Sequence, residues 1–449
     1  MKIKFLGAAG TVTGSSYVLT SGSGQSILVD LGMFQGTSEI DALNYKSFEY
    51  DPSQLSGAVL THAHLDHCGR LPIIIPMGFK GKIWMTPSTR ELTELSLLDS
   101  AKVALQDRKE VLYDKELAYK TFNRFKTTEY HTTVPIGDFA ATMYDAGHIL
   151  GSASLVIEDQ HPNSEIRTIV FSGDLGNTPE DLVKETEFIN KADAVVMEST
   201  YGDRLHPEED AEAMLQNEIN TIEKSESTLL IPVFALERTQ EILHMIMHLK
   251  KTGKVKANTP VILDSPMADK ATEIYMKYPQ LFNAHLHDDL QEGTPFGFQG
   301  LELIERREQS KALHMRKGAK VILAGGGMMA GGRIVGHAGY YLSDPNNRLF
   351  IVGYQGEETL GRELMEGKKG VEIDGAMVPV HATVTTTHAM SSHADQQQLM
   401  NWLKHIQGVK KLFLTHGEDG PRAALAKRVS TELGIQDISL PQLNQELSF

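Results

Sequence analysis

The ten residues 61–70, THAHLDHCGR, constrain this chain more than any other stretch. They place three imidazoles and a carboxylate within six positions, directly after an apolar, β-branched run that predicts a buried strand. Imidazole nitrogen and carboxylate oxygen are ligands that zinc and similar divalent ions accept. Four ligands on so short a loop cannot all reach one ion without severe strain. We therefore expect two neighbouring ions, with His62 and His64 binding one and Asp66 and His67 the other.

The length of 449 residues, 41% of them hydrophobic, is enough for two or three globular domains with well-filled cores. The single cysteine, Cys68, excludes an internal disulfide framework and fits a reducing compartment, and we interpret it as a packed small residue and not as a ligand. No run approaches the roughly 18 to 20 apolar residues that a membrane span needs, and glycines interrupt the amino-terminal apolar run too early for a signal peptide. We expect a soluble, cytoplasmic protein without a membrane partner.

The formal net charge is −15, from 43 basic and 58 acidic residues. This balance argues against a broad basic surface of the kind that dominates nonspecific nucleic-acid binding. It does not exclude a phosphodiester substrate, because a pair of divalent cations supplies local positive charge that an acidic exterior need not cancel beyond a Debye length of about 8 Å. We expect such a substrate to be held by few contacts.

Three further residues that could serve a metal stand at strand ends or in tight turns. Asp30 ends an apolar strand, where an uncompensated carboxylate would be costly. We expect it to accept a hydrogen bond from a metal-bound imidazole or a loop amide, although a simple turn or capping role is the alternative. His148 lies among small residues in a predicted turn and could supply a third imidazole. Asp174 follows another apolar strand between glycines, and its two oxygens could bridge two cations.

The HxHxDH run after a strand resembles the signature of the metallo-β-lactamase fold. Later stretches resemble the motifs of the β-CASP nucleases, RNA- and DNA-processing hydrolases related to the cleavage and polyadenylation endonuclease. The motif residues are Glu198 after a strand (motif A), His393 in MSSHAD (motif B) and His416 in THGE (motif C). Glu237 departs from the pattern, since glycine is usual before the arginine, and Met390 and Ser392 depart from it in motif B. The resemblance covers nearly the whole chain.

This resemblance implies an α/β fold, a metallo-β-lactamase αββα sandwich with an inserted α/β β-CASP domain. The residues agree with an insertion, because the composition shifts near His206 and strand and helix patterns then alternate as far as residue 385. We expect the first part of the metallo-β-lactamase domain over residues 1–207, the β-CASP domain over 208–385 and the last part of the first domain over 386–449.

The resemblance also implies a ligand set for two zinc ions. His62, His64 and His148 would bind one ion, Asp66, His67 and His416 the other, Asp174 would bridge both, and Asp30 would hold a ligand from behind. A hydroxide shared by the two ions would attack phosphorus in line. His393, oriented by Glu198, would donate a proton to the leaving sugar oxygen, so that these two residues and Asp66 form the catalytic set.

Three residues are candidates for substrate binding. The glycine-rich loop GGGMMA leads to Arg333 at a predicted helix start, which favours an anion site over the dinucleotide site that a relaxed fingerprint would also allow. Arg238 and Ser392 lie in stretches that resemble β-CASP motifs. His244 and His248 are spaced like a zinc pair on one predicted helix, but their apolar neighbours favour a packed helix face.

We predict a zinc-dependent phosphodiesterase that cleaves RNA, with an endoribonuclease acting on single strands as the preferred form. A small-molecule hydrolase for lactams or thioesters would leave the long insertion and His393 without a task, and a DNA-directed nuclease is a further alternative. A non-catalytic assembly subunit is the third class, but such relatives lose ligands, whereas this chain keeps all seven. The choices between endo- and exonucleolytic cleavage and between monomer and homodimer stay open.

Overall fold

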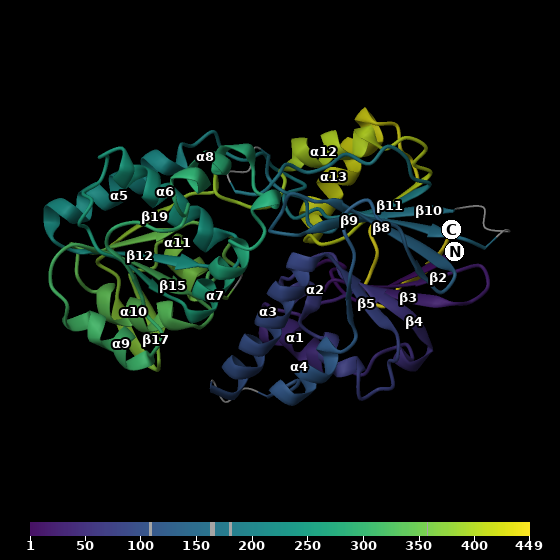
Figure 1. Cartoon of the computed structure of the whole chain (residues 1–449), viewed down its shortest axis with the longest axis horizontal. Coiled ribbons are helices and arrows are strands. Elements are labelled where there is room, and N and C mark those ends of the chain that lie inside the picture. Colours follow the sequence, from purple (N-terminus) through teal and green to yellow (C-terminus); the bar gives the residue numbers. More distant parts are fainter. Residues whose placement is uncertain (107–109, 162–166, 179–181, 357) are drawn as a thin grey trace. The chain divides into compact units, whose positions relative to one another are not determined.

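A computed structural model describes residues 1–106, 110–161, 167–178, 182–356 and 358–449. These residues form two compact units, each of which mixes helices with sheets (Figure 1). Unit 1 combines Met1–Leu205 with Ser392–Phe449, and unit 2 is the insertion His206–Ser391. The predicted α/β class is therefore confirmed.

Unit 1 contains two sheets that share one core. The strand orders are β22-β1-β2-β3-β4-β5-β6 and β21-β20-β11-β10-β9-β8-β7. The first sheet consists of β1 (Lys2–Phe5), β2 (Ser16–Thr20), β3 (Ser26–Leu31), β4 (Leu55–Val59), β5 (Lys82–Met85), β6 (Phe125–Thr127) and β22 (Glu446–Ser448). The second consists of β7 (Val134–Ile136), β8 (Phe139–Asp145), β9 (Ala153–Asp159), β10 (Thr168–Phe171), β11 (Ala194–Met197), β20 (Lys411–Leu414) and β21 (Ile438–Ser439). Phe5 and Phe413, one from each sheet, lie with ring centroids 5.3 Å apart in that core.

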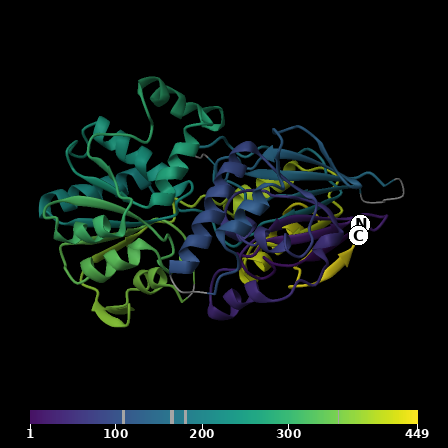
Figure 2. The same ribbon diagram turned by 60° about the horizontal axis from the view of Figure 1, so that its bottom comes forward.

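Helices cover the outer face of each sheet and complete the predicted αββα sandwich (Figure 1). The helices of unit 1 are α1 (Ser38–Asp41), α2 (Leu65–Cys68), α3 (Pro87–Gln106), α4 (Lys115–Phe122), α12 (Gln396–His405) and α13 (Asp419–Glu432). α3 and α4 pack on the first sheet, and α12 and α13 on the second. In β10, Ile169 and Phe171 enter the shared core while Val170 packs under the helices, which explains why the strand is apolar throughout. Figure 2 shows the two termini side by side, where β22 pairs with β1.

Unit 2 is built on one parallel sheet of order β14-β13-β15-β12-β16-β19. Its strands are β12 (Thr228–Val233), β13 (Val261–Asp264), β14 (Leu301–Leu303), β15 (Lys320–Gly325), β16 (Arg348–Ile351) and β19 (Thr383–Thr386), with a hairpin of β17 (Gly370–Ile373) and β18 (Ala376–Pro379). Its helices are α5 (Ala211–Ser225), α6 (Arg238–Lys251), α7 (Pro266–Tyr275), α8 (Ala284–Glu292), α9 (Arg307–Ala312), α10 (Arg333–Tyr341) and α11 (Leu360–Met365). Because β19 still pairs with β16, the chain returns to unit 1 only at Ser392. None of the described helices combines the length and the apolar character that crossing a bilayer requires.

The strand directions of unit 1 bring polar residues to common edges. β10, β11 and β20 run parallel, so the loops that follow them begin at the same edge of the second sheet. These loops carry Asp174, Glu198 and His416. In the first sheet, the parallel strands β3 and β4 likewise bring two polar residues to one edge, Asp30 near the end of β3 and His62 in the loop after β4. β4 ends two residues before the predicted end at residue 61, because the Thr61 N–H donates to the Asp30 carboxylate at 2.8 Å and not to a neighbouring strand.

Candidate metal centre

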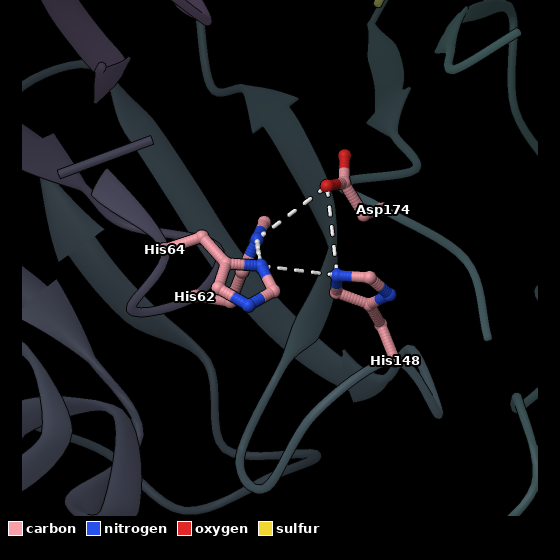
Figure 3. Close-up of side chains that lie close together, drawn as sticks. All are labelled: His62, His64, His148 and Asp174. Atoms are coloured by element: carbon pink, nitrogen blue, oxygen red, sulfur yellow. Dashed lines mark hydrogen bonds and ion pairs between the residues drawn. The ribbon is translucent and has the colours of Figure 1, made fainter. Parts of the chain in front are cut away.

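Four donor atoms from three loops converge in a first cluster (Figure 3). His64 Nδ1 lies 3.1 Å from His62 Nε2 and 3.2 Å from His148 Nε2. Asp174 Oδ2 lies 3.5 Å from His62 Nε2 and 3.7 Å from His148 Nε2. Zinc bonds of about 2.0–2.1 Å place tetrahedral ligand atoms roughly 3.3 Å apart, so this spacing suits one such ion.

The second cluster uses the other oxygen of the same aspartate. Asp174 Oδ1 lies 3.3 Å from His67 Nε2 and 3.7 Å from His416 Nε2. Asp66 Oδ2 lies 3.4 Å from His416 Nε2 and 4.0 Å from His67 Nε2. The structure thus brings the seven predicted ligands together, and Asp174 gives one oxygen to each cluster.

The second cluster holds two buried polar atoms that have no hydrogen bond to any described residue, His67 Nε2 and Asp174 Oδ1. The two atoms lie 3.3 Å apart, but neither makes a hydrogen bond, and burying polar atoms in this way is costly, whereas a cation between them would satisfy both. Imidazole nitrogens and carboxylate oxygens are also the donors that zinc accepts. The residues therefore fit a pair of divalent ions.

Groups behind the ligands fix which ring nitrogen faces each cluster. His67 Nδ1 donates to Asp30 Oδ2 at 2.7 Å, and His148 Nδ1 donates to the backbone carbonyl of Ser392 at 2.9 Å. In both rings this leaves Nε2 as the nitrogen that faces the cluster and could bind an ion. Asp30 thus lies behind an imidazole of the second cluster, and its role in supporting a metal ligand stays a prediction.

Two threonines that sequence reasoning missed complete this support. The Thr61 hydroxyl donates to Asp30 Oδ2 at 2.8 Å, and the Thr200 hydroxyl lies 3.1 Å from His416 Nδ1. Each threonine directly precedes or closely follows a motif residue at a strand end, which is the only signal that could have pointed to it. Threonine is too common at strand ends for that signal to be specific.

Burial and charge set the protonation of the ligands. Burial lowers the pKa of His62 and His148 well below the usual range and that of His64 to about 4, so these three imidazoles are neutral at pH 7, the form that binds a metal. Burial would lower the pKa of His67 as well, but the carboxylates of Asp174 and Asp30 raise it well above the usual range. The first cluster is therefore ready for a cation, while the second must release a proton to bind one.

His393 and Glu198 form a pair beside both clusters. His393 Nδ1 lies 3.3 Å from Glu198 Oε2, and the imidazole ring is 4.6 Å from that of His148 and 5.8 Å from that of His416. Burial acts to lower the pKa of His393, but the Glu198 carboxylate outweighs it and raises the pKa to about 9. The Leu175 N–H donates to Glu198 Oε1 at 2.6 Å, which fixes the carboxylate in turn.

Three family descriptions match this sequence. Residues 9–214 match the metallo-beta-lactamase superfamily, residues 239–364 the Beta-Casp domain, and residues 377–441 the Zn-dependent metallo-hydrolase RNA specificity domain. A ribonuclease of Thermus thermophilus is 38% identical over 449 residues, which cover 99% of each chain.

The chain belongs to the β-CASP family of the metallo-β-lactamase superfamily.

Further relatives are more distant. An RNase of Saccharolobus solfataricus is 31% identical and is matched over 99% of this chain and 85% of its own. A transcription termination factor of Methanosarcina mazei is 31% identical over 99% of this chain and 71% of its own. A solved structure of a protein of unknown function from Enterococcus faecalis shares the fold, with a TM-score of 0.54 and 13% identity over 99% of both chains.

The two predicted substrate arginines lie in unit 2, which contains the β-CASP domain match, and both have acidic partners there. Arg238 is buried and pairs with Glu241 on its own helix. Arg333 begins α10, pairs with Asp264 at the end of β13 and also donates to two backbone carbonyls. A guanidinium engaged in this way stabilises the local fold, and contact of either arginine with a substrate stays a prediction. Ser392 contributes its backbone carbonyl to His148, as described above.

Glu237 replaces the glycine usual in β-CASP proteins and adopts φ 65° and ψ −66°, a region that favours glycine. The Tyr275 hydroxyl donates to its carboxylate at 2.6 Å, and the Glu237 N–H donates to the Tyr275 oxygen at 3.1 Å. These two hydrogen bonds offset the unfavourable backbone conformation. The departure from the family pattern is thus accompanied by a compensating tyrosine.

Proposed function

We propose that this protein is a zinc-dependent ribonuclease that hydrolyses phosphodiester bonds of single-stranded RNA within the strand. The observation that carries the proposal is the pair of clusters that share Asp174, with the His393–Glu198 pair beside them. The ribonuclease names of two relatives support RNA as the substrate class. His393, the motif-B histidine, supports a nuclease over a hydrolase of lactams or thioesters, because such a hydrolase would not need this residue.

Two zinc ions would be held by the seven clustered side chains. His62, His64 and His148 would hold the first, Asp66, His67 and His416 the second, and Asp174 both. When bound, the ions supply a hydroxide nucleophile at neutral pH and positive charge opposite the phosphodiester. Asp30, Thr61 and Thr200 keep the ligand rings in orientation, so that the site is formed before the substrate arrives.

His393 would protonate the sugar oxygen that leaves. Its Nδ1 faces Glu198, so Nε2 is the atom that would donate the proton to the substrate. Glu198 keeps the imidazole in its charged form and in one orientation, because the carboxylate is itself held by the Leu175 N–H. The backbone of Ala394 donates to the Leu175 carbonyl at 2.8 Å, which ties the His393 segment to the loop that carries Asp174.

The test uses purified full-length protein with end-labelled and internally labelled single-stranded RNA. We expect internal cuts in RNA, slower or no cleavage of the matched DNA strand, and no turnover of nitrocefin or thioesters. His393→Ala should slow cleavage roughly 100- to 10,000-fold, the usual contribution of a general acid, while zinc content stays unchanged. His405→Ala, an exposed histidine of the same unit, is the matched control and should keep full activity.

Different outcomes would contradict different parts of this proposal. Full RNA cleavage by His393→Ala at unchanged zinc content would show that another group is the general acid. Turnover of nitrocefin without RNA cleavage would show that the substrate class is wrong. Mononucleotides released only from one end would replace the endonucleolytic mode by an exonucleolytic one.

A further inference from the structure

A separate convergence of donor atoms lies in unit 2, on helices α6 and α8. His244 and His248 are four residues apart, so their rings share one face of α6, with centroids 4.5 Å apart. Asp289 of α8 reaches both rings with a single oxygen. Its Oδ2 lies 3.0 Å from His244 Nε2 and 2.8 Å from His248 Nε2. The sequence suggested a packed helix face here because it did not reveal that Asp289 joins the two histidines.

The three donor atoms form a small, nearly equilateral triangle. The third edge, between the two Nε2 atoms, measures 3.1 Å. If both nitrogens carried hydrogens toward Asp289, these hydrogens would crowd each other across that edge. A divalent ion removes the conflict, because both nitrogens then present lone pairs to one centre. Ligand atoms on a zinc ion with bonds of about 2.0–2.1 Å are roughly 3.3 Å apart, close to the edges of this triangle.

The surroundings also suit a bound cation. The side chains of Asp289 and His244 are 9% and 10% exposed, so the carboxylate needs a positive partner. Lys251 Nζ lies 3.4 Å from Oδ1 of Asp289, the oxygen that faces away from the histidines, and so partly offsets the carboxylate charge without occupying the triangle. His248 is 35% exposed, which leaves one side open for a water as fourth ligand.

We propose that His244, His248 and Asp289 form a structural zinc site that joins α6 to α8. The residues between the two histidines are Met245, Ile246 and Met247, so no glutamate stands between them to act as the general base of a metalloprotease arrangement. The site therefore binds a metal without catalysing a reaction. It does not depend on the proposed ribonuclease activity, because all three ligands belong to unit 2.

The test compares zinc bound per chain in full-length wild-type protein, Asp289→Asn and Asp288→Asn, by elemental analysis after dialysis against trace zinc. Asp288 is the matched control, since it neighbours Asp289 on the same helix but is exposed. Asp289→Asn should hold one zinc fewer than wild type and lose at least about tenfold in affinity for that ion, while Asp288→Asn should match wild type. RNA cleavage should be the same in all three proteins.

His248→Gln is a second variant in case Asp289→Asn does not fold, because His248 is partly exposed and tolerates substitution better. It should also lose one zinc. Zinc content equal to wild type in the folded variants would overturn the proposal in favour of a metal-free hydrogen-bonded cluster. Loss of zinc by Asp288→Asn as well would show adventitious surface binding only, and loss of RNA cleavage together with the zinc would overturn the structural role.

Discussion

Replacing Asp30 by asparagine should weaken metal binding at the second cluster. Oδ1 of Asp30 accepts from the Thr61 N–H at 2.8 Å, and Oδ2 accepts from the Thr61 hydroxyl at 2.8 Å and from His67 Nδ1 at 2.7 Å. An amide has only one oxygen. If that oxygen faces His67, the NH₂ group meets the Thr61 N–H. If it faces the Thr61 N–H, the NH₂ group meets His67 Nδ1 and drives the ring proton to Nε2, the ligating atom.

Asparagine is preferable to alanine for this test because of the backbone. Asp30 has φ 53°, and asparagine tolerates this left-handed conformation nearly as well as aspartate, whereas alanine would add strain. Alanine would also leave the Thr61 N–H buried without its acceptor. Any effect of Asp30→Asn can therefore be attributed to the lost carboxylate.

The size of the effect follows from the lost contacts. A hydrogen bond to a charged group contributes about 1.5–3 kcal/mol, which corresponds to roughly 10- to 150-fold in affinity. Removal of a group that supports a metal ligand typically costs about 10- to 100-fold as well. We expect zinc affinity at the second cluster to fall within this range, and RNA cleavage to fall at limiting zinc but recover at high zinc.

The assay is zinc competition with a chromophoric chelator, followed by RNA cleavage rates across a range of free zinc. Asp138→Asn is the control, because its carboxylate accepts a hydrogen bond from Ser21 outside the metal centre. Zinc affinity of Asp30→Asn within twofold of wild type would refute the reasoning. A cleavage defect that high zinc does not restore would also refute it, since the defect would then not arise from metal binding.

Three other predictions follow from the structure. Glu198→Gln should lower the pKa of His393, so kcat should begin to fall at a lower pH than in the wild type. An unchanged kcat–pH profile would show that Glu198 does not keep His393 protonated. Burial raises the pKa of Asp145 to about 7, so its contribution to stability is present at low pH and is lost as pH rises from about 4 through about 7, by up to roughly 4 kcal/mol. Asp145→Asn should therefore flatten the dependence of Tm on pH, and identical Tm–pH curves would contradict this. Glu237→Ala should lose about 1.5–3 kcal/mol with the hydrogen bond that the Tyr275 hydroxyl donates to the carboxylate, and Glu237→Gly should be about 1–3 kcal/mol more stable than Glu237→Ala because it relieves the backbone. Equal urea midpoints for these two variants would show that φ carries no strain.

The sequence alone predicts the fold class because the strands are short, continuous apolar runs. β3, β5, β10, β11 and β20 lie at the residues that these runs predict. β11 shows the reason most clearly, because it is buried on both faces and so needs an apolar side chain at every position. The residue types at the strand ends likewise predict metal chemistry, because few other tasks need so many imidazoles and acids together. These are local properties that neighbouring residues reveal without knowledge of the fold.

Only the tertiary structure decides how those residues combine. The division of the Asp174 oxygens between two clusters depends on the packing of two sheets, and the ring nitrogen that His148 presents depends on a carbonyl 244 residues away. The sequence does not reveal that Asp264 pairs with Arg333. It also does not reveal that Asp289, on another helix, supplies a third donor atom beside His244 and His248. Contacts between residues distant in the chain are set by packing, and packing is a property of the whole core that no single stretch of sequence contains.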